Sequence, residues 1–322
     1  MTARGRHFTG GVAPLVLALL CLLAIMPRAA QATFPGRPGL IVFSKIELHG
    51  PEAEGGLFAI KPGQEGIRQL TANPRDYDPS FAPSGRQLVF RRVDTPEPGI
   101  YLLDLASGLT TRILSREDDL DPAFGPDGMI AFLRFVRRSR SYDLILRTPD
   151  GHLRQLTSGP AREEEPFFSP NGRRIFYVRY PFHGGTLTRS EAPRGPRALF
   201  SVRVDGSDQR RVKVMPKAED LDISPNGHDL VFDVFGGATE TGGGAKVWRQ
   251  RLGGGGLNLI ANEARSPAYS PSGDVIAYAN YEGLWVRRAD GTGSPGLLFG
   301  AAYRPLQGGG TLLVQPAWQP LP

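Results

Sequence analysis

Apolar and polar residues alternate along this chain in short runs, and a tight-turn signal precedes each run. The segments RQLVFRR (86–92), MIAFLRF (129–135) and RRIFYVRY (173–180) each follow a proline and a glycine. Successive side chains of a β-strand point to opposite faces of a sheet, so alternation with period two is typical of strands. The 41 glycines and 29 prolines also favour tight turns over helices. The pattern therefore predicts an all-β chain of many short strands.

One short pattern, close to D-P-x-[aromatic]-x-P-x-G, recurs six times. The copies begin near residues 78, 121, 165, 220, 266 and 315, so the starts are 43, 44, 55, 46 and 49 residues apart. An aromatic residue or Ile stands two positions before the second proline, and a strand pattern follows the glycine. Repeats of about 40 to 50 residues with strand-like content are typical of propeller blades, each built from four antiparallel strands.

The two ends of the chain together supply the four strands of the sixth blade. The sixth copy stops at Pro322 and leaves only its first strand, whereas residues 39–47, 56–63 and 66–73 resemble the second, third and fourth strands of a blade. Pairing the last strand of the chain with these three would close the ring and leave no exposed sheet edge. We therefore predict a single six-bladed β-propeller over residues 33–322.

The first 32 residues have the features of a secretory signal peptide. Arg4 and Arg6 give a basic start, an uncharged apolar run spans residues 11–26, and AQA (30–32) places small residues before a cut ahead of Thr33. We expect cleavage there, with a membrane anchor as the alternative. The mature protein would then lie in the bacterial periplasm or outside the cell, without membrane insertion.

Charge argues against nucleic acid as a partner. The formal charge of the chain is +6, and the predicted leader holds three arginines and no acidic residue, which leaves +3 for residues 33–322. A weak net charge spread over so many residues does not indicate a basic surface patch that could bind a nucleic-acid phosphate backbone. The only cysteine, Cys21, lies in the leader, so stability must come from packing rather than from disulfides.

The repeat resembles that of a known family. The openings DPSFAPSG (78–85) and EPFFSPNG (165–172) resemble the WD-type repeat of TolB-like proteins, which are six-bladed propellers. The resemblance covers nearly all of residues 39–322. TolB itself carries an α/β domain before its propeller, and here about six residues separate the predicted cut from the first strand. The resemblance implies a non-enzymatic scaffold that holds a protein or peptide partner in the cell envelope, and we expect it to be a monomer.

No catalytic residue is predicted. The sequence contains neither a G-x-S-x-G nor an H-E-x-x-H motif, and the four histidines after the leader are scattered over different blades: His49, His152, His183 and His228. No cofactor is expected. Propeller lyases can bring histidines from separate blades together, so an enzyme stays open as the alternative: a metal-dependent lyase or hydrolase that acts on a sugar or lactone at the channel mouth.

Acidic residues stand at or just before the start of four repeats. The candidates for a binding face are Asp76, Asp78, Asp119, Asp121, Glu163, Glu165 and Asp220. We expect these segments to join the outer strand of one blade to the inner strand of the next, with their carboxylates at one mouth of the central channel. Such a ring could hold a divalent cation such as calcium, or a basic partner segment. Alternatively, these residues cap turns by accepting backbone N–H bonds.

The two longest insertions are predicted at the same end of the propeller. Residues 181–198 contain Arg189, Arg194 and Arg197, and residues 235–245 form a second, glycine-rich extension. Loops on a rigid scaffold carry function more often than the scaffold itself does. We therefore add these three arginines to the candidate binding face, with tolerated surface length as the alternative.

Overall fold

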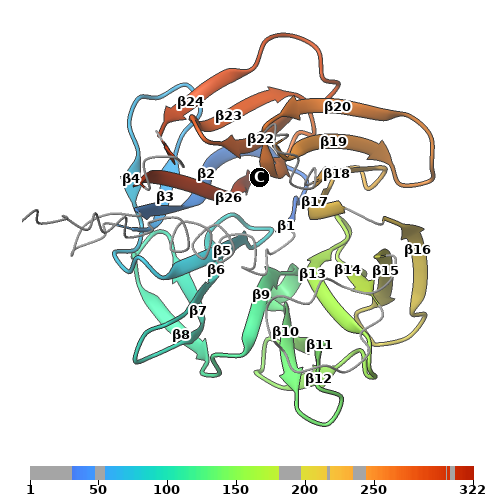
Figure 1. Cartoon of the computed structure of the whole chain (residues 1–322). Helices are drawn as coiled ribbons and strands as arrows, with labels where there is room; N and C mark the ends of the chain where they lie inside the picture. Colours follow the sequence, from blue (N-terminus) through green and yellow to red (C-terminus); the bar gives the residue numbers. More distant parts are fainter. Residues whose placement is uncertain are drawn as a thin grey trace, which may run out of the picture.

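The computed structural model describes residues 31–47, 55–180, 197–215, 218–234, 244–301, 303–304 and 309–322. It confirms the predicted six-bladed β-propeller (Figure 1). The described residues contain strands and one short 3-10 helix, η1 (Pro126–Gly128). Most of the predicted leader and of both insertions lies outside these residues, so the signal peptide remains a prediction.

Each of the first three blades is one antiparallel sheet of four strands in chain order. Blade 1 has β5 (Asp76–Phe81), β6 (Gln87–Arg92), β7 (Gly99–Asp104) and β8 (Thr110–Leu114); blade 2 has β9 (Asp119–Phe124), β10 (Ile130–Val136), β11 (Ser141–Arg147) and β12 (Leu153–Gln155); blade 3 has β13 (Arg162–Phe168), β14 (Arg174–Tyr180), β15 (Ala198–Arg203) and β16 (Arg210–Val214). The first strand of each blade lies nearest the axis of the propeller and is called its inner strand.

Blades 4 and 5 repeat this order, and blade 6 closes the ring. Blade 4 has β17 (Ala218–Ile223), β18 (Asp229–Val234), β19 (Lys246–Arg251) and β20 (Leu257–Asn262); blade 5 has β21 (Arg265–Tyr269), β22 (Val275–Asn280), β23 (Gly283–Arg288) and β24 (Gly296–Gly300); blade 6 has β26 (Gly309–Leu321), β2 (Arg37–Glu47), β3 (Gly56–Ile60) and β4 (Arg68–Gln69). β25 (Tyr303–Arg304) pairs with the start of β26.

Closure follows the predicted scheme. The C-terminal strand β26 pairs antiparallel with β2, with Trp318 opposite Ile41 and Ala317 opposite Val42. The last strand of the chain and the first blade strand therefore share one sheet, which closes the ring.

The hydrophobic core lies between the blades. The aromatic position of the repeat is buried in all six copies, with exposures of 0 to 7%: Phe81, Phe124, Phe168, Ile223, Tyr269 and Trp318. Phe124, for example, packs in one cluster with Val89 and Ile100 of the preceding blade. Each blade therefore depends on its neighbours to bury its faces, as in other repeat architectures.

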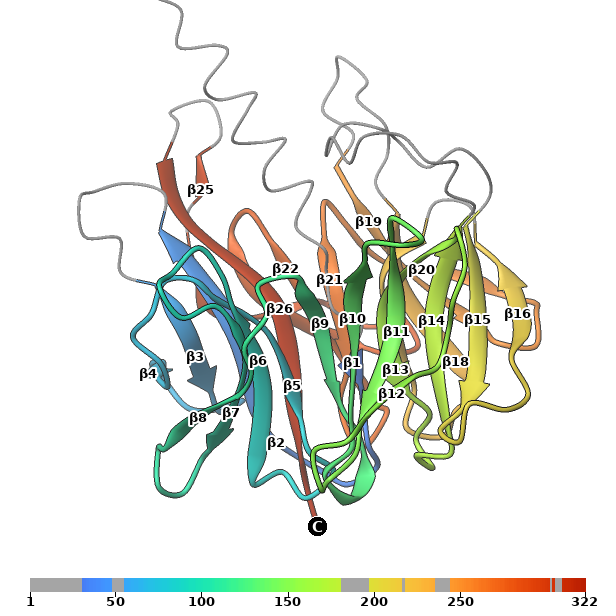
Figure 2. The same cartoon turned by 90° about the horizontal axis from the view of Figure 1, so that it is seen from below.

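The two ends of the propeller differ in character. At the end where the inner strands finish, the x-P-x-G turns lie around the axis, and the C-terminus lies there too (Figure 2). We call this the turn end, and the opposite end, where the inner strands begin, the strand-start end. At the turn end, Gly172 has a φ of 66°, and a Cβ there would lie 2.3 Å from Pro126 of the preceding blade. Only glycine combines this backbone conformation with so close an approach.

A segment that the sequence did not predict lies near the propeller axis. β1 (Gln31–Ala32) pairs in parallel with β17 and also contacts the inner strands β9 and β13 (Figure 1). Phe34 is buried against Leu120, Ala123 and Phe168 of blades 2 and 3. β1 is thus the end of the predicted leader and Phe34 lies just after the predicted cut, so residues on both sides of the cut pack against inner strands.

Candidate functional site along the propeller axis

Every inner strand is bulged at the first residue of its repeat. In blade 1, Tyr77 pairs with Arg91 and Ser80 pairs with Val89, so the two residues between them have no regular partner. The same shift occurs in the other five blades. In five of the six copies the next residue is proline, which has no N–H to give to the ladder. The repeat thus encodes a β-bulge in each inner strand.

The first residues of the six copies form what we call the opening ring. All six have a φ between 49° and 57°, a left-handed conformation that is uncommon outside glycine: Asp78, Asp121, Glu165, Asp220, Ser266 and Gln315. Their exposure does not exceed 6%. The expectation that the acidic residues lie in segments joining the blades is therefore wrong, because the bulge holds them inside the inner strands.

Hydrogen bonds of the opening ring run from one blade to the next. Asp121 Oδ2 accepts the backbone N–H of Glu165 at 3.4 Å, and Glu165 Oε2 accepts the N–H of Leu221 at 3.2 Å. Ser266 Oγ donates to Asp220 Oδ2 at 2.8 Å. Asp121 and Glu165 thus accept backbone N–H bonds, as the alternative interpretation proposed, but across blade boundaries instead of within a turn. They link blades 2 to 5 around the axis.

The opening ring also links the last blade to the first. The side-chain amide of Gln315 donates to Asp78 Oδ1, and Gln315 Oε1 accepts the backbone N–H of Asp78 at 3.3 Å. Ser44 of β2 donates to the same Oε1 at 3.4 Å. The opening ring therefore reinforces the junction that the strand pairing of β26 and β2 closes.

Burial controls the electrostatics of the opening ring. Burial raises the pKa of Asp121 well above its usual value, the charge of Asp78 raises it further, and the Arg91 guanidinium opposes both. The pKa of Glu165 is likewise raised by burial and then by Asp220, with Arg197 opposing. A buried carboxyl that is not fully neutralised favours its protonated form.

Arg91 is a residue of this site that the sequence reasoning missed. Its Nη1 lies 3.7 Å from Asp78 Oδ2, and its side chain is 10% exposed. The equivalent strand position holds Leu133 in blade 2 and Val178 in blade 3. Blade 4 has Asp233 and blade 6 has Ser44 at this position, so the repeat pattern alone does not single out Arg91. A buried arginine needs an acidic partner, which Asp78 provides.

The acidic residues two positions before the opening ring form a separate set of ion pairs. Cross-strand N–O distances are 2.7 Å for Arg92 with Asp76, 2.6 Å for Arg134 with Asp119, and 2.6 Å for Arg179 with Glu163. Each arginine also lies over an aromatic ring, as Arg92 does over Tyr101 at 4.4 Å. The three carboxylates are at most 1% exposed. Asp76, Asp119 and Glu163 therefore bind arginines of their own blades.

A partly exposed group of charges lies at the strand-start end of blades 3 and 4. Glu164 binds Arg162 and Arg197, both at 3.0 Å, and accepts a hydrogen bond from Tyr180. Arg197 also reaches Glu219 at 3.3 Å. We call Arg162, Glu164, Tyr180, Arg197 and Glu219 the Glu164 cluster. Of the three arginines predicted for the binding face, the structure places Arg197 here, whereas Arg189 and Arg194 lie outside the described residues.

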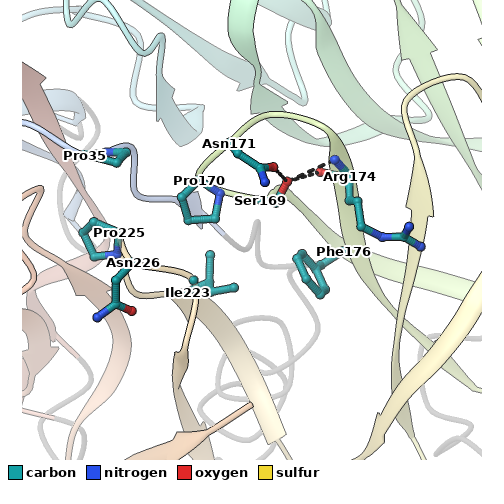
Figure 3. Close-up of a pocket in the computed structure, with 10 residues that line it drawn as sticks. Pro35, Ser169, Pro170, Asn171, Arg174, Phe176, Ile223, Pro225 and Asn226 are labelled. Carbon is teal, nitrogen blue, oxygen red and sulfur yellow. Dashed lines mark hydrogen bonds between the residues drawn. The ribbon is translucent and has the colours of Figure 1, made fainter. Parts of the chain in front are cut away.

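A cavity of about 420 Å³ lies at the turn end, between blades 3 and 4 (Figure 3). Its walls include Pro170 and Asn171 of one turn, Pro225 of the next, and Pro35 of the N-terminal segment. The Arg174 guanidinium is held by Asp208 at 2.6 Å and is directed away from these prolines in Figure 3. The cavity therefore presents mainly apolar surface, and no sequence pattern had indicated it.

Among the described residues, no group of three or more His, Cys, Asp or Glu side chains is arranged to hold a metal ion. His152 and His228 are exposed, and His49 and His183 lie outside the described residues. The cation at the channel mouth stays a prediction.

Within the described part of the chain, no helix has the length and apolar character needed to cross a bilayer.

The fold and the opening ring define the class of protein: an all-β propeller of six repeats, with opening-ring hydrogen bonds that link blades 2 to 5 and blade 6 to blade 1. The model of one family, described as the TolB beta propeller domain, matches residues 78–291. This range is more than half of the chain, which therefore belongs to that family.

Individual proteins are similar to this chain in sequence or in fold. An uncharacterised protein of Agrobacterium fabrum is 24% identical over 248 residues, which are 72% of this chain and 69% of that protein. The crystal structure of TolB from Acinetobacter baumannii has a TM-score of 0.65 at 18% identity, and the match covers 88% of this chain and 67% of that one. A gluconolactonase from Xanthomonas campestris has a TM-score of 0.55 at 15% identity, covering 90% and 98%. At such identities the likeness to both solved structures shows the fold alone.

Proposed function

We propose that this protein is a non-enzymatic binding protein of the bacterial cell envelope that holds a protein or peptide partner at the strand-start end of its propeller. Membership of the TolB propeller family supports the class of function, and the predicted signal peptide supports the location. The opening ring supplies rigidity, because its hydrogen bonds hold neighbouring blades together. A rigid rim lowers the conformational cost of binding.

The observation that carries the proposal is the position of the Glu164 cluster. Blades 1 and 2 have Tyr77 and Leu120 where blade 3 has Glu164, so the repeat itself does not require this charge. Arg197 joins the cluster directly after the arginine-bearing residues 181–196. Charges that the fold does not require, at the edge of a rigid scaffold, favour recognition.

The cluster contains charges that a partner could reach. Glu219 and Arg162 are 29% and 25% exposed at their side chains, whereas Glu164 and Arg197 are 11% and 14% exposed. A charged peptide segment can thus bond to Glu219 and Arg162 without breaking the more buried Glu164–Arg197 pair. Such rim charges change association rate and specificity more than they change total affinity.

The test is a cross-linking pull-down from a periplasmic preparation of the exported protein. The variant Arg162→Glu/Glu219→Lys reverses both accessible charges, and Arg86→Glu alters an exposed arginine at the turn end as a matched control. We expect one envelope protein to be captured by the native chain and by Arg86→Glu, and to be lost with the double variant. Equal capture by all three chains would refute the strand-start end as the binding face.

The same preparation tests the alternative function. A divalent metal at about one per chain, with no captured protein, would favour the metal-dependent lyase or hydrolase, and sugars and lactones would be the first substrates to try. Capture of a partner by protein that contains no stoichiometric metal would support the binding function.

A further inference from the structure

In the N-terminal segment near the propeller axis, Thr33 contacts one buried carboxylate, that of Asp222. Thr33 Oγ1 donates to Asp222 Oδ2 at 2.8 Å, and the backbone N–H of Thr33 lies close enough to lower the pKa of the same carboxyl. Thr33 is 4% exposed and Asp222 is fully buried. Thr33 is also the residue that follows the predicted signal-peptide cut. The atom that cleavage would convert to an α-ammonium therefore already lies against a buried acid.

Asp222 departs from the repeat at its position. The other five copies have Ser80, Ala123, Phe167, Ala268 and Ala317 there. Asp222 Oδ2 accepts the backbone N–H of Tyr269 in the next blade at 2.7 Å, and Ser80 Oγ accepts the equivalent N–H of Phe124 at 3.0 Å. A serine is thus sufficient for the link between blades. A buried carboxylate costs more than a hydroxyl, so the link alone does not explain Asp222.

We propose that cleavage before Thr33 creates an N-terminal ammonium that forms a buried ion pair with Asp222, so that the chain's own N-terminus is the cation held at the propeller axis. The site accommodates a primary ammonium: the Asp222 carboxylate accepts from it, and the Tyr269 carbonyl oxygen lies 3.0 Å from Thr33 Oγ1 to orient the residue. Phe34, packed between blades 2 and 3, fixes the next residue of the segment. The inference is independent of the partner proposed above.

Removal of the leader would change the energetics of Asp222. In the chain that retains residues before Thr33, burial raises the pKa of Asp222 to about 7, opposed by the N–H of Tyr269 and by Thr33. Burial raises the pKa of the nearby Tyr269 phenol, Arg249 opposes this shift, and the charges of Asp229 and Asp222 add to it. An added ammonium lowers the pKa of Asp222, and the carboxylate raises the pKa of the ammonium above its ordinary value of about 8.

These shifts give the processed and unprocessed chains different pH profiles. With residues before Thr33 retained, Asp222 has a folded pKa above its unfolded one, so its stabilising contribution is lost as pH rises from about 4 to about 7. With the ammonium present, the ion pair keeps stability through this window until the ammonium deprotonates at alkaline pH. The stability difference between the chains should therefore be largest near pH 7 to 8 and disappear at pH 4.

The experiment begins with N-terminal sequencing of the exported protein, which we expect to start at Thr33. This chain is compared with one that begins at Gln31 and keeps β1, each also prepared as Asp222→Ser, which retains an acceptor as Ser80 does. At pH 7.5 we expect the Tm of the chain starting at Thr33 to exceed that of the chain starting at Gln31 by about 4 °C or more. Within the Asp222→Ser pair the difference should vanish, as it should for the native pair at pH 4.

A second readout does not depend on the stability of the variants. The α-amine of the folded exported protein should react with an acylating reagent at least about tenfold more slowly than in urea, because it is buried and paired. An export product that starts before Thr33, a Tm difference that persists in Asp222→Ser, or an α-amine equally reactive in the folded and unfolded protein would each overturn the proposal.

Discussion

Glu165 Oε2 accepts a hydrogen bond from the backbone N–H of Leu221 at 3.2 Å, although 56 positions separate the two residues in the chain. Glu165 belongs to the inner strand of blade 3 and Leu221 to that of blade 4. This contact shows what the repeated acids do in the fold: a left-handed bulge residue directs its side chain to the next blade. The link is sensitive to both charge and hydrogen-bonding capacity, which can be changed separately.

Glu165→Gln and Glu165→Ala should have different effects. Glutamine retains an oxygen for the Leu221 N–H and never ionises, whereas alanine leaves that N–H buried without its acceptor and should cost about 1 to 3 kcal/mol. Because the folded pKa of Glu165 is raised, its stabilising contribution is lost as pH rises through that pKa. We expect Glu165→Gln to match the native protein at pH 4 and exceed it at pH 8. Thermal unfolding at both pH values measures this, and equal losses for both variants would contradict it.

The ion pair of Arg134 and Asp119 should show strong coupling. Arg134→Met leaves the Asp119 carboxylate buried without its cation and should destabilise the protein by about 3 kcal/mol. Burial already raises the pKa of Asp119 despite the arginine, so this carboxylate depends on its partner. The double variant Asp119→Ala/Arg134→Met should cost clearly less than the two single losses added together. Urea unfolding of the four chains tests this, and simple additivity would disprove the coupling.

Closure of the ring at the turn end depends on a glycine. Gly85 has a φ of 66°, and a Cβ there would lie 2.0 Å from the carbonyl oxygen of Pro320, whereas Gly108 has a φ of 73° with open space around it. Gly108→Ala should cost only the backbone strain, about 1 kcal/mol. Gly85→Ala must also displace the C-terminal strand and should cost at least about twice as much. Similar Tm values for the two variants would mean that the C-terminal strand moves freely.

Ionisation of Asp143 should destabilise the protein as the pH rises from about 4 to neutral. Burial raises the pKa of Asp143 to about 6 and that of Glu163 to about 7, and the charge of Asp143 contributes to the second shift. Both folded pKa values exceed the unfolded ones, so the stability these groups contribute is full below about pH 4 and lost as pH rises through 6 to 7. Asp143→Asn keeps an oxygen for Gln155.

This variant should therefore gain about 1 to 2 kcal/mol relative to the native protein at pH 8 and nothing at pH 4. The comparison requires Tm or urea midpoints across that range. A gain of the same size at both pH values would indicate an effect of packing and not of ionisation.

Much of the fold could be predicted because the repeat carries local information. Proline and glycine set each turn, and period-two alternation sets each strand, so six copies in register gave six blades. The incomplete last copy, together with three strand patterns near the start, predicted the pairing of β26 with β2. Local signals of this kind do not depend on knowing what lies across a blade boundary.

The candidate site was predicted only in composition. Asp78, Asp121, Glu165 and Asp220 were identified as a set, but they were expected in connecting segments with carboxylates at a channel mouth. The bulge that places them inside the inner strands results from a proline without an N–H and a left-handed residue before it. The hydrogen-bond partner of each side chain lies in the neighbouring blade, and the sequence spacing of the repeats does not reveal it.

The number of blades, the turns and the acidic character of the repeat follow from the sequence alone, because residues close together in the chain encode each of them. Closure of the ring follows from comparing the incomplete last copy with the strand patterns near the start of the chain. Only the tertiary structure decided which donors those acids bind and that Thr33 meets Asp222 across 189 positions. Burial and hydrogen bonding between distant segments fix the pKa values and partners of buried charges. These folded-state pKa values and hydrogen-bond partners are established only when the six blades have assembled around the axis.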